Sequence, residues 1–208
     1  MRLPLFPLGV VVYPGEPLPL HIFEERYRQM TAHCLQQNTP FGILCMNDGR
    51  MAKVGCSARI KRILQRYEDG RLDIMVEGKM RFQWVTLYND HPYLTGEVNW
   101  LSEPNRPTRK GAVERVIAQH MRLMEIAGRT VRPGLYESSY GVSWIIGRNA
   151  GLTLAQKQEL LEIMPEKDRV EFLIAHLEAF IPRVERTSSL RKKIMSNGHF
   201  KDFPPEKK

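Results

Sequence analysis

The sequence predicts an α+β protein in which a β-rich half is followed by a helical bundle. Up to about Ser102, short apolar runs alternate with turn signals, which is typical of strands. Beyond that point the apolar residues recur at helical spacing. A polar segment with two prolines, EPNRPT at 103–108, separates the two patterns. The predicted units are therefore a β-rich domain over 1–103, a helical bundle over 104–197 and a flexible basic tail over 198–208.

The chain opens with the run LPLFPLGVVVYPGEPLPLHIFEERYRQM, Leu3 to Met30. Its prolines interrupt the apolar stretch, which argues against a secretory signal and against a membrane span. Proline cannot donate to a strand ladder, so we expect Leu3–Leu8 at a sheet edge. Pro14 and Gly15 have the chemistry of a turn, and we expect a stiff bend from there to Pro19.

One helix is expected inside the β-rich half, from about Phe23 to Gln36. Glu24 lies in its predicted first turn, where the helix dipole favours acids. We expect Glu24 and Arg26 to hold this helix against the sheet, and Arg81 to reach back from a strand to Glu24. The alternative for these charged groups, acid-base catalysis or ligand binding, is less common at a helix start.

The remaining strands are expected to form a mainly antiparallel sheet or a small barrel. Glycine reaches positive φ without a steric clash, so Asp48–Gly49, Glu68–Gly70 and Glu77–Gly78 are predicted hairpin turns. The predicted strands are Phe41–Met46, Val54–Leu64, Arg71–Gly78, Met80–Tyr88 and Tyr93–Leu101.

In the second half, the first amphipathic helix is expected to end near Gly128. A short apolar helix is expected at Val142–Ile146. Thr153 and Gln156 have the spacing of a capping box for a third helix. A fourth helix is expected from Glu166 to Phe180 or beyond, with Pro182 kinking or ending it.

The composition places few limits on function. The chain has 208 residues, a net charge of +8 and three cysteines without a CxxC motif. This pattern suggests neither a disulfide framework nor a zinc site, and it fits reduced cysteines in a cytoplasm. Most of the excess positive charge lies in the last part of the chain, which is typical of a solvated tail.

No catalytic or metal-ligating constellation is predicted. His33 and Cys34 are neighbours, but adjacent residues on a helix point about 100° apart and do not face each other. The six histidines show no metal-ligand spacing. We therefore expect no enzyme, no metal and no cofactor.

Six motifs along the chain belong together: the opening run at 3–30, FGIL at 41–44, VGCSARI at 54–60, EGKMRF at 77–82, LTLAQKQELLE at 152–162 and DRVEFLIAHL at 168–177. Together they resemble the N-terminal substrate-binding domain family of Lon protease, and especially small bacterial proteins that consist of this domain alone. The resemblance implies a β-rich half like the pseudouridine synthase and archaeosine transglycosylase (PUA) domains, followed by a helical bundle. The sequence contains no GxxxxGK[ST] loop for nucleotide phosphates. It departs from the family locally at Glu25, where proline is frequent.

The resemblance implies a non-catalytic module that binds unfolded or extended polypeptide segments. Its surface is expected in the cleft between the two halves and to include Tyr13, Phe23, Tyr27 and Trp144, although aromatics at such positions are more often core residues. The alternative is RNA binding of the PUA-like type, motivated by the basic tail. A nearly balanced charge over the rest of the chain argues against nucleic acid as the partner. The identity of the partner and the oligomeric state stay open.

Overall fold

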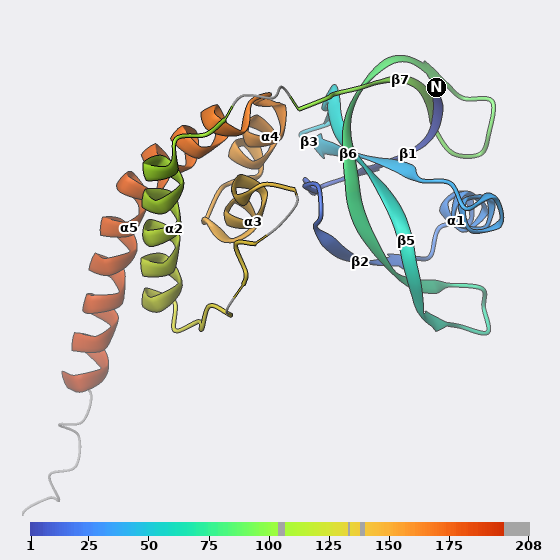
Figure 1. Cartoon of the computed structure of the whole chain (residues 1–208). Coiled ribbons are helices and arrows are strands. Elements are labelled where there is room, and N and C mark those ends of the chain that lie inside the picture. The colour runs from blue at the N-terminus through green and yellow to red at the C-terminus, as the bar shows by residue number, and fades with distance from the viewer. Residues whose placement is uncertain (104–106, 133, 138–139, 198–208) are drawn as a thin grey trace, which may run out of the picture.

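The computed structural model describes residues 1–103, 107–132, 134–137 and 140–197. The predicted boundary at 103–108 therefore lies partly outside the described residues, and the predicted tail at 198–208 lies wholly outside them. Figure 1 shows the strands gathered at one end of the molecule and most of the helices at the other, with a single helix on the far side of the strands.

The strands close into a small barrel. Neighbouring strands follow the order β1-β7-β6-β5-β3, and a parallel pairing of β1 with β3 completes the ring. Strand β2 pairs with β6, and β4 pairs with β3. Most of these pairings are antiparallel, so the predicted α+β class with a mainly antiparallel sheet or small barrel is confirmed. The strands are β1 Arg2–Leu8, β2 Pro17–Ile22, β3 Phe41–Asn47, β4 Arg50–Met51, β5 Val54–Arg66, β6 Leu72–Tyr88 and β7 Thr95–Trp100.

The prediction that Leu3–Leu8 lies at a sheet edge is wrong. Strand β1 changes partners along its length: residues 2–4 pair with β7, and residues 5–8 pair with β3. Backbone N–H groups of a strand alternate between its two sides, and that of Leu5 lies on the β7 side, where it donates to the carbonyl of Leu94, the residue before β7. The nitrogen of Pro4 therefore faces β3 before that pairing begins, and the nitrogen of Pro7 faces β7 after that pairing has ended. Both prolines thus lie where no ladder hydrogen bond is needed.

The segment expected to be a bend before the first helix is partly strand β2, which pairs with β6 at the edge of the sheet. Pro17 and Pro19 lie on this strand, opposite Glu77 and Met75. Prolines on an edge strand also hinder the addition of a further strand, because they offer no N–H donor.

The hairpin predicted at Glu77–Gly78 is wrong, because β6 runs through it without a break. Gly78 instead allows the turn at Tyr13–Glu16 to lie directly on the strand. Its N–H donates to the Glu16 carbonyl at 2.9 Å, and its carbonyl accepts from the Gly15 N–H at 2.8 Å. A Cβ at Gly78 would lie 2.2 Å from the Tyr13 carbonyl oxygen. This glycine therefore serves close backbone approach, not a turn.

Helix α1, Glu25–Gln37, covers one side of the barrel, as predicted in position. Its buried face carries Tyr27, Met30, Thr31 and Cys34. Tyr27, Met30 and Cys34 share a core with barrel residues, among them Ile74 and Val76 of β6.

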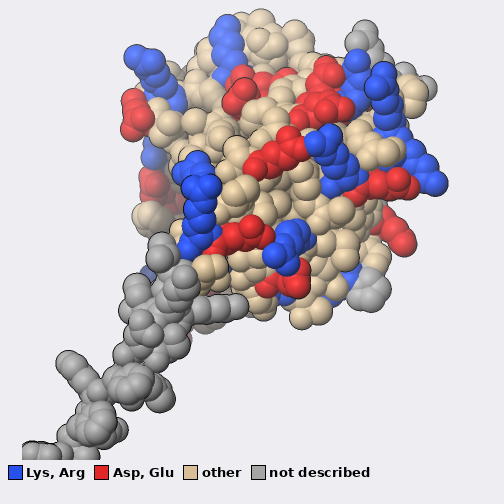
Figure 2. Space-filling model, turned by 90° about the vertical axis from the view of Figure 1, so that its left-hand side faces the viewer, with Lys and Arg blue, Asp and Glu red and all other residues tan. Residues whose placement is uncertain are grey.

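The remaining helices form the other half of the molecule. The helix predicted from Glu166 does not end at Pro182 but continues to Asn197. On the side of the molecule formed by α2 and α5, Figure 2 shows cationic and anionic side chains interspersed. Arg122 of α2, for example, pairs with Glu185 of α5 at 3.0 Å. The helices are α2 Lys110–Ile126, α3 Val142–Asn149, α4 Leu154–Glu162 and α5 Glu166–Asn197.

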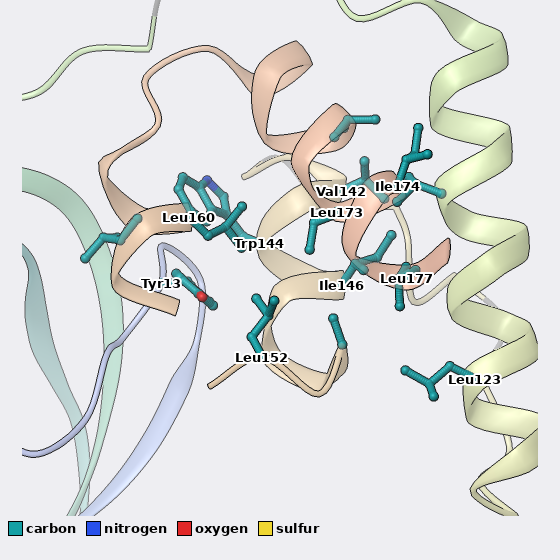
Figure 3. Close-up of a cluster of buried hydrophobic side chains, with 14 of the residues drawn as sticks. Tyr13, Leu123, Val142, Trp144, Ile146, Leu152, Leu160, Leu173, Ile174 and Leu177 are labelled. Carbon is teal, nitrogen blue, oxygen red and sulfur yellow. The ribbon is translucent and has the colours of Figure 1, made fainter. Parts of the chain in front are cut away.

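A hydrophobic core joins the two halves. Figure 3 shows Tyr13 extending from the β1–β2 connection into the cluster formed by the helices, beside Trp144 and Leu160. The rings of Tyr13 and Trp144 stack with their centroids 5.2 Å apart. The Tyr13 hydroxyl donates to the Lys157 carbonyl of α4 at 3.1 Å. The barrel thus contributes a side chain to the helical core.

Candidate functional site: a groove between the barrel and helix α4

An open groove of about 680 Å³ lies between the β3–β4 hairpin and helix α4. Side chains of Met51, Leu154 and Ala155 make part of its lining apolar, and charged groups lie among them. A groove of this size can hold a few side chains of an extended chain. Its lining residues are Cys45, Asn47, Asp48, Arg50, Met51, Ala52, Leu154, Ala155, Gln158, Glu159 and Glu162.

The hairpin wall is set by a local turn. Asp48 has φ 48° and Gly49 has φ 73°, so both central residues adopt the left-handed conformation that tight two-residue hairpins require. The predicted turn at this position is confirmed. Beyond β4, the N–H of Ala52 donates to the Cys45 carbonyl at 2.8 Å. Both residues line the groove, and the bond between them fixes this wall.

The helical wall begins at a capping box. The Thr153 hydroxyl accepts from the Gln156 N–H at 3.3 Å, and the Gln156 amide oxygen accepts from the Thr153 N–H at 3.0 Å. The predicted box is thus confirmed. One turn further on, the Gln158 amide donates to the Val54 carbonyl of β5 at 3.0 Å and to the Glu162 carboxylate at 2.7 Å. Gln158 therefore ties α4 to the barrel and orients an acid of the groove.

Two buried arginines hold the end of α4. Arg81 of β6 donates to the Leu161 and Ile163 carbonyls, each at 2.8 Å. Arg169 of α5 donates to the Ile163 carbonyl at 2.9 Å. A cation at the C-terminal end of a helix satisfies carbonyls without an intrahelical partner and complements the helix dipole. The groove wall is consequently anchored at both ends.

The same two guanidinium groups share one carboxylate and one aromatic ring. Glu103 accepts from Arg81 at 2.7 Å and from Arg169 at 2.9 Å. Both cations lie against Trp144, with the guanidinium carbons 5.2 and 4.0 Å from the ring centroid. Burial lowers the pKa of Arg81, and the neighbouring Glu103 opposes that effect. This cluster is a structural junction between the barrel and the helices.

The prediction that Arg81 reaches Glu24 is therefore wrong, as is the prediction that Glu24 and Arg26 hold α1 against the sheet. Glu24 and Arg26 pair with each other at 2.7 Å on the surface, and Arg26 lies over the Tyr27 ring. Helix α1 is held by apolar burial instead. The motif at Pro14 and Gly15 does form the predicted turn, in which the Glu16 N–H donates to the Tyr13 carbonyl at 3.0 Å.

Of the four aromatic residues predicted to line a common cleft, the structure brings together Tyr13 and Trp144, whose rings stack, and places Phe23 and Tyr27 elsewhere. Tyr13 and Trp144 are buried in the core between the halves, Tyr27 is buried under α1, and Phe23 is 60% exposed and stacks on His21. None of them lines the groove at α4. Trp144 borders a smaller pocket of about 190 Å³ beside Arg81. The burial of Tyr13, Tyr27 and Trp144 agrees with the expectation that aromatics at such positions are more often core residues.

The groove is lined by more carboxylate groups than cationic groups, and these carboxylates form no ion pairs with the described residues. Asp48, Glu159 and Glu162 are exposed, and none of them forms an ion pair within the described part of the chain. Arg50, on the hairpin wall, is likewise unpaired among the described residues. Sequence reasoning missed this site because its two walls are about a hundred residues apart. The turn at Asp48–Gly49 and the box at Thr153 marked each wall, but no local pattern shows that they meet.

The described residues do not assemble an evident reactive centre. Burial raises the pKa of Cys34 to about 11 and that of Cys56 to about 12, which disfavours the reactive thiolate at neutral pH. His33 is exposed while Cys34 is buried, so the two side chains point apart. Among the described His, Cys, Asp and Glu residues, no group of three or more is placed to hold a metal ion. None of the described helices combines the length and apolar character needed to cross a membrane.

Comparison with known proteins identifies what this arrangement is similar to. The model of the family described as the ATP-dependent protease La (LON) substrate-binding domain matches residues 2–179. The Lon protease of Lawsonia intracellularis is 26% identical over 200 residues, which cover 84% of this chain and 23% of the relative. That of Flavobacterium johnsoniae is 21% identical over 213 residues, covering 93% of this chain and 26% of the relative. The chain thus spans about a quarter of the length of these curated relatives.

Solved structures show the same fold. The crystal structure of a Lon N-terminal domain protein from Xanthomonas campestris has a TM-score of 0.68 and 26% sequence identity, covering 84% of this chain and 98% of that one. The N-terminal domain of the Mycobacterium avium complex Lon protease has a TM-score of 0.63 and 19% identity, covering 86% of this chain and 98% of that one. The similarity therefore includes helices as well as the barrel.

Proposed function

The chain belongs to the substrate-binding domain family of the ATP-dependent protease La (LON), and from that premise we propose that it is a non-catalytic module that binds extended segments of polypeptide. The observation that carries the proposal is the open groove between the β3–β4 hairpin and α4, about 680 Å³ in volume and partly apolar. Apolar side chains in a groove gain free energy by leaving water, and they accept many sequences because this attraction has no direction.

The stiffness of both walls supports this role. The hairpin is closed by a tight turn, and α4 is capped at its start and held by Arg81 at its end. A groove that exists before its ligand arrives avoids part of the ordering cost of binding. The ligand itself, an extended segment, must still lose conformational entropy, so moderate affinity and rapid release are expected of single segments.

Filling the groove tests the proposal. Ala155 is exposed on α4 and lines the groove, so Ala155→Trp adds a large ring there without removing a packed side chain. The probe is fluorescein-labelled casein, with binding measured by fluorescence anisotropy. Wild-type protein is expected to bind casein without degrading it, and Ala155→Trp to weaken binding at least about tenfold, or ~1.4 kcal/mol.

The matched control is Ala118→Trp, at another exposed alanine, which lies on α2 outside the groove. It is expected to bind casein like the wild type. Casein binding that Ala155→Trp leaves unchanged would show that the groove is not the polypeptide site. Degradation of casein by the purified chain, lost on a single substitution, would contradict a non-catalytic role.

A further inference from the structure

We propose that the groove selects polypeptide segments in which apolar residues lie beside lysine or arginine. This inference rests on the proposed function and names the chemical class of its ligand. The groove combines the apolar side chains of Met51, Leu154 and Ala155 with acids from both walls. A segment that places an alkyl or aromatic side chain on the apolar surface brings its neighbouring residues to those acids.

The charges of the groove are available to a ligand. Asp48 at the hairpin turn and Glu159 and Glu162 on α4 have no cationic partner among the described residues. Elsewhere on the surface, acids such as Glu77 and Glu185 are paired with lysine or arginine. Among the described residues that line the groove, Arg50 is the one cation. Three carboxylates against one guanidinium leave a net charge of about −2 in the groove at neutral pH.

One of these carboxylates is positioned by the fold. The Gln158 amide, fixed by its hydrogen bond to the Val54 carbonyl, also donates to Glu162. Glu162 lies three residues beyond Glu159 on α4, so both side chains lie on the same face of the helix. The acidic side of the groove is therefore built into the wall that the two buried arginines anchor. The hydrogen bond from the Gln158 side-chain amide also holds the Glu162 carboxylate in place before a ligand arrives.

The local charge opposes the charge of the whole chain. A protein with a net charge of +8 attracts anionic peptides at long range. If the chain bound peptides through its overall field, acidic segments would be favoured. A preference for basic segments would therefore come from the groove and not from the overall charge. Whether basic or acidic peptides bind more tightly distinguishes these two origins of binding.

The test compares two fluorescein-labelled peptides of equal length and equal apolar content. In one, lysine flanks each leucine; in the other, glutamate does. At 0.01 M salt, where the Debye length is about 30 Å, we expect the basic peptide to bind about tenfold more tightly. At 1 M salt, where it is about 3 Å, the ratio is expected to fall to about twofold or less.

Charge removal locates the effect. The double variant Glu159→Gln and Glu162→Gln retains helix propensity and the acceptor for Gln158, and it is expected to lower the low-salt ratio to about threefold or less. The control, Glu97→Gln and Glu171→Gln, removes two unpaired, exposed acids outside the groove and changes the net charge equally. It is expected to leave the ratio unchanged.

The outcomes separate this inference from the proposed function. Equal binding of both peptides, or tighter binding of the acidic one, with both blocked by Ala155→Trp, would overturn the charge preference and leave the polypeptide groove standing. Binding that Ala155→Trp does not affect would overturn both. The same is true if no peptide binds and the protein forms a dimer that Ala155→Trp abolishes, because the occupant would then be a second copy of the chain.

Discussion

His120 is the buried side chain whose environment has the clearest measurable consequence. It lies on α2 with no exposed surface, and its Nδ1 is 2.8 Å from the Tyr136 hydroxyl. Its Nε2 is buried and has no hydrogen-bond partner in the described part of the chain. Burial lowers the pKa of His120 from 6.5 to about 4, because the charged form would be poorly solvated there. The folded protein therefore holds this imidazole in its neutral form at physiological pH.

The shift predicts acid sensitivity. The unfolded chain binds a proton at His120 below pH 6.5 while the folded chain does not, so the stabilising contribution is present above that pH. It is lost as the pH falls toward about 4, at up to 1.36 kcal/mol per pH unit and ~3 kcal/mol in total. The loss is measured as the difference between the free energies of unfolding by urea at pH 7.5 and at pH 5. His120→Gln should show a smaller loss than the wild type, and His33→Gln, at an exposed position, the same loss.

Glycine gives a second test at the residue scale, because two glycines of this chain have opposite surroundings. At Gly78 an added Cβ would meet the Tyr13 carbonyl oxygen at 2.2 Å, whereas at Gly111 on α2 nothing lies within 4 Å. Gly78→Ala should destabilise the protein by ~1 to 3 kcal/mol, because strand and turn must move apart. Gly111→Ala should stabilise it by ~0.5 to 1 kcal/mol, since alanine is the better helix former. Equal effects in thermal unfolding would contradict the assigned role of Gly78.

At the scale of elements, the sequence predicted what local chemistry controls. The hairpin turn at Asp48–Gly49 and the capping box at Thr153 depend on residues within four positions of each other, and both are confirmed. The sequence predicted two strands where the structure has the single strand β6, because a glycine that forms a turn and a glycine that permits a close backbone contact cannot be distinguished in a sequence. The partner change of β1 was missed for a related reason. A proline shows that one backbone hydrogen bond of the sheet is missing, but it does not show on which side of the strand the neighbouring strand is missing.

Predicting the groove would have required knowledge of contacts between residues even farther apart in the sequence. Its acids are ordinary surface residues in the sequence, and only the packing of α4 beside the β3–β4 hairpin brings them together. Arg81 was recognised as structural, but its partners, the carbonyls at the end of α4, lie about eighty residues away. A single sequence contains no signal for such a pairing. Spacing alone also does not show that Tyr13 and Trp144 pack in one core while Tyr27 packs in another.

The capping box predicts coupled effects on stability. Thr153→Ala should cost ~1 kcal/mol, because it leaves an N–H of the first turn of α4 without its acceptor. Gln156→Ala removes the reciprocal bond to the Thr153 N–H. Because the two residues act as one unit, the double variant should lose less than the sum of the single losses in urea unfolding. Strict additivity would mean that the two bonds contribute independently and that the box is not a cooperative cap.

At the scale of the whole molecule, the barrel and the helical half are joined by polar as well as apolar contacts. Tyr13 inserts into the helical core, and Arg81 crosses in the same direction to the end of α4. Glu103, which pairs with both buried arginines, stands at the predicted boundary between domains 1–103 and 104–197. We propose that these units fold as one cooperative structure, because the wall of the groove is completed only when both are in place.

Arg81 tests that proposal directly. Arg81→Met keeps much of the side-chain volume but removes the donors to the Leu161 and Ile163 carbonyls, and it leaves Arg169 with less competition for Glu103. Breaking a buried charged network by removing one partner typically costs ~3 to 5 kcal/mol. Part of that cost is avoided here because Glu103 is partly exposed and keeps Arg169 as a partner. We therefore expect a loss of ~2 to 4 kcal/mol. Arg59→Met, at an exposed arginine of β5, is the control.

Hydrogen exchange measured by mass spectrometry shows where that loss falls. If the two halves are cooperative, Arg81→Met should accelerate exchange in α4 and also in the barrel strands β5 and β6, because opening the junction exposes both. The same variant should weaken casein binding, since the α4 wall of the groove is no longer anchored. Faster exchange confined to α4, with unchanged protection in β5 and β6, would show instead that the barrel is stable alone and that the helices dock onto it as a separate unit.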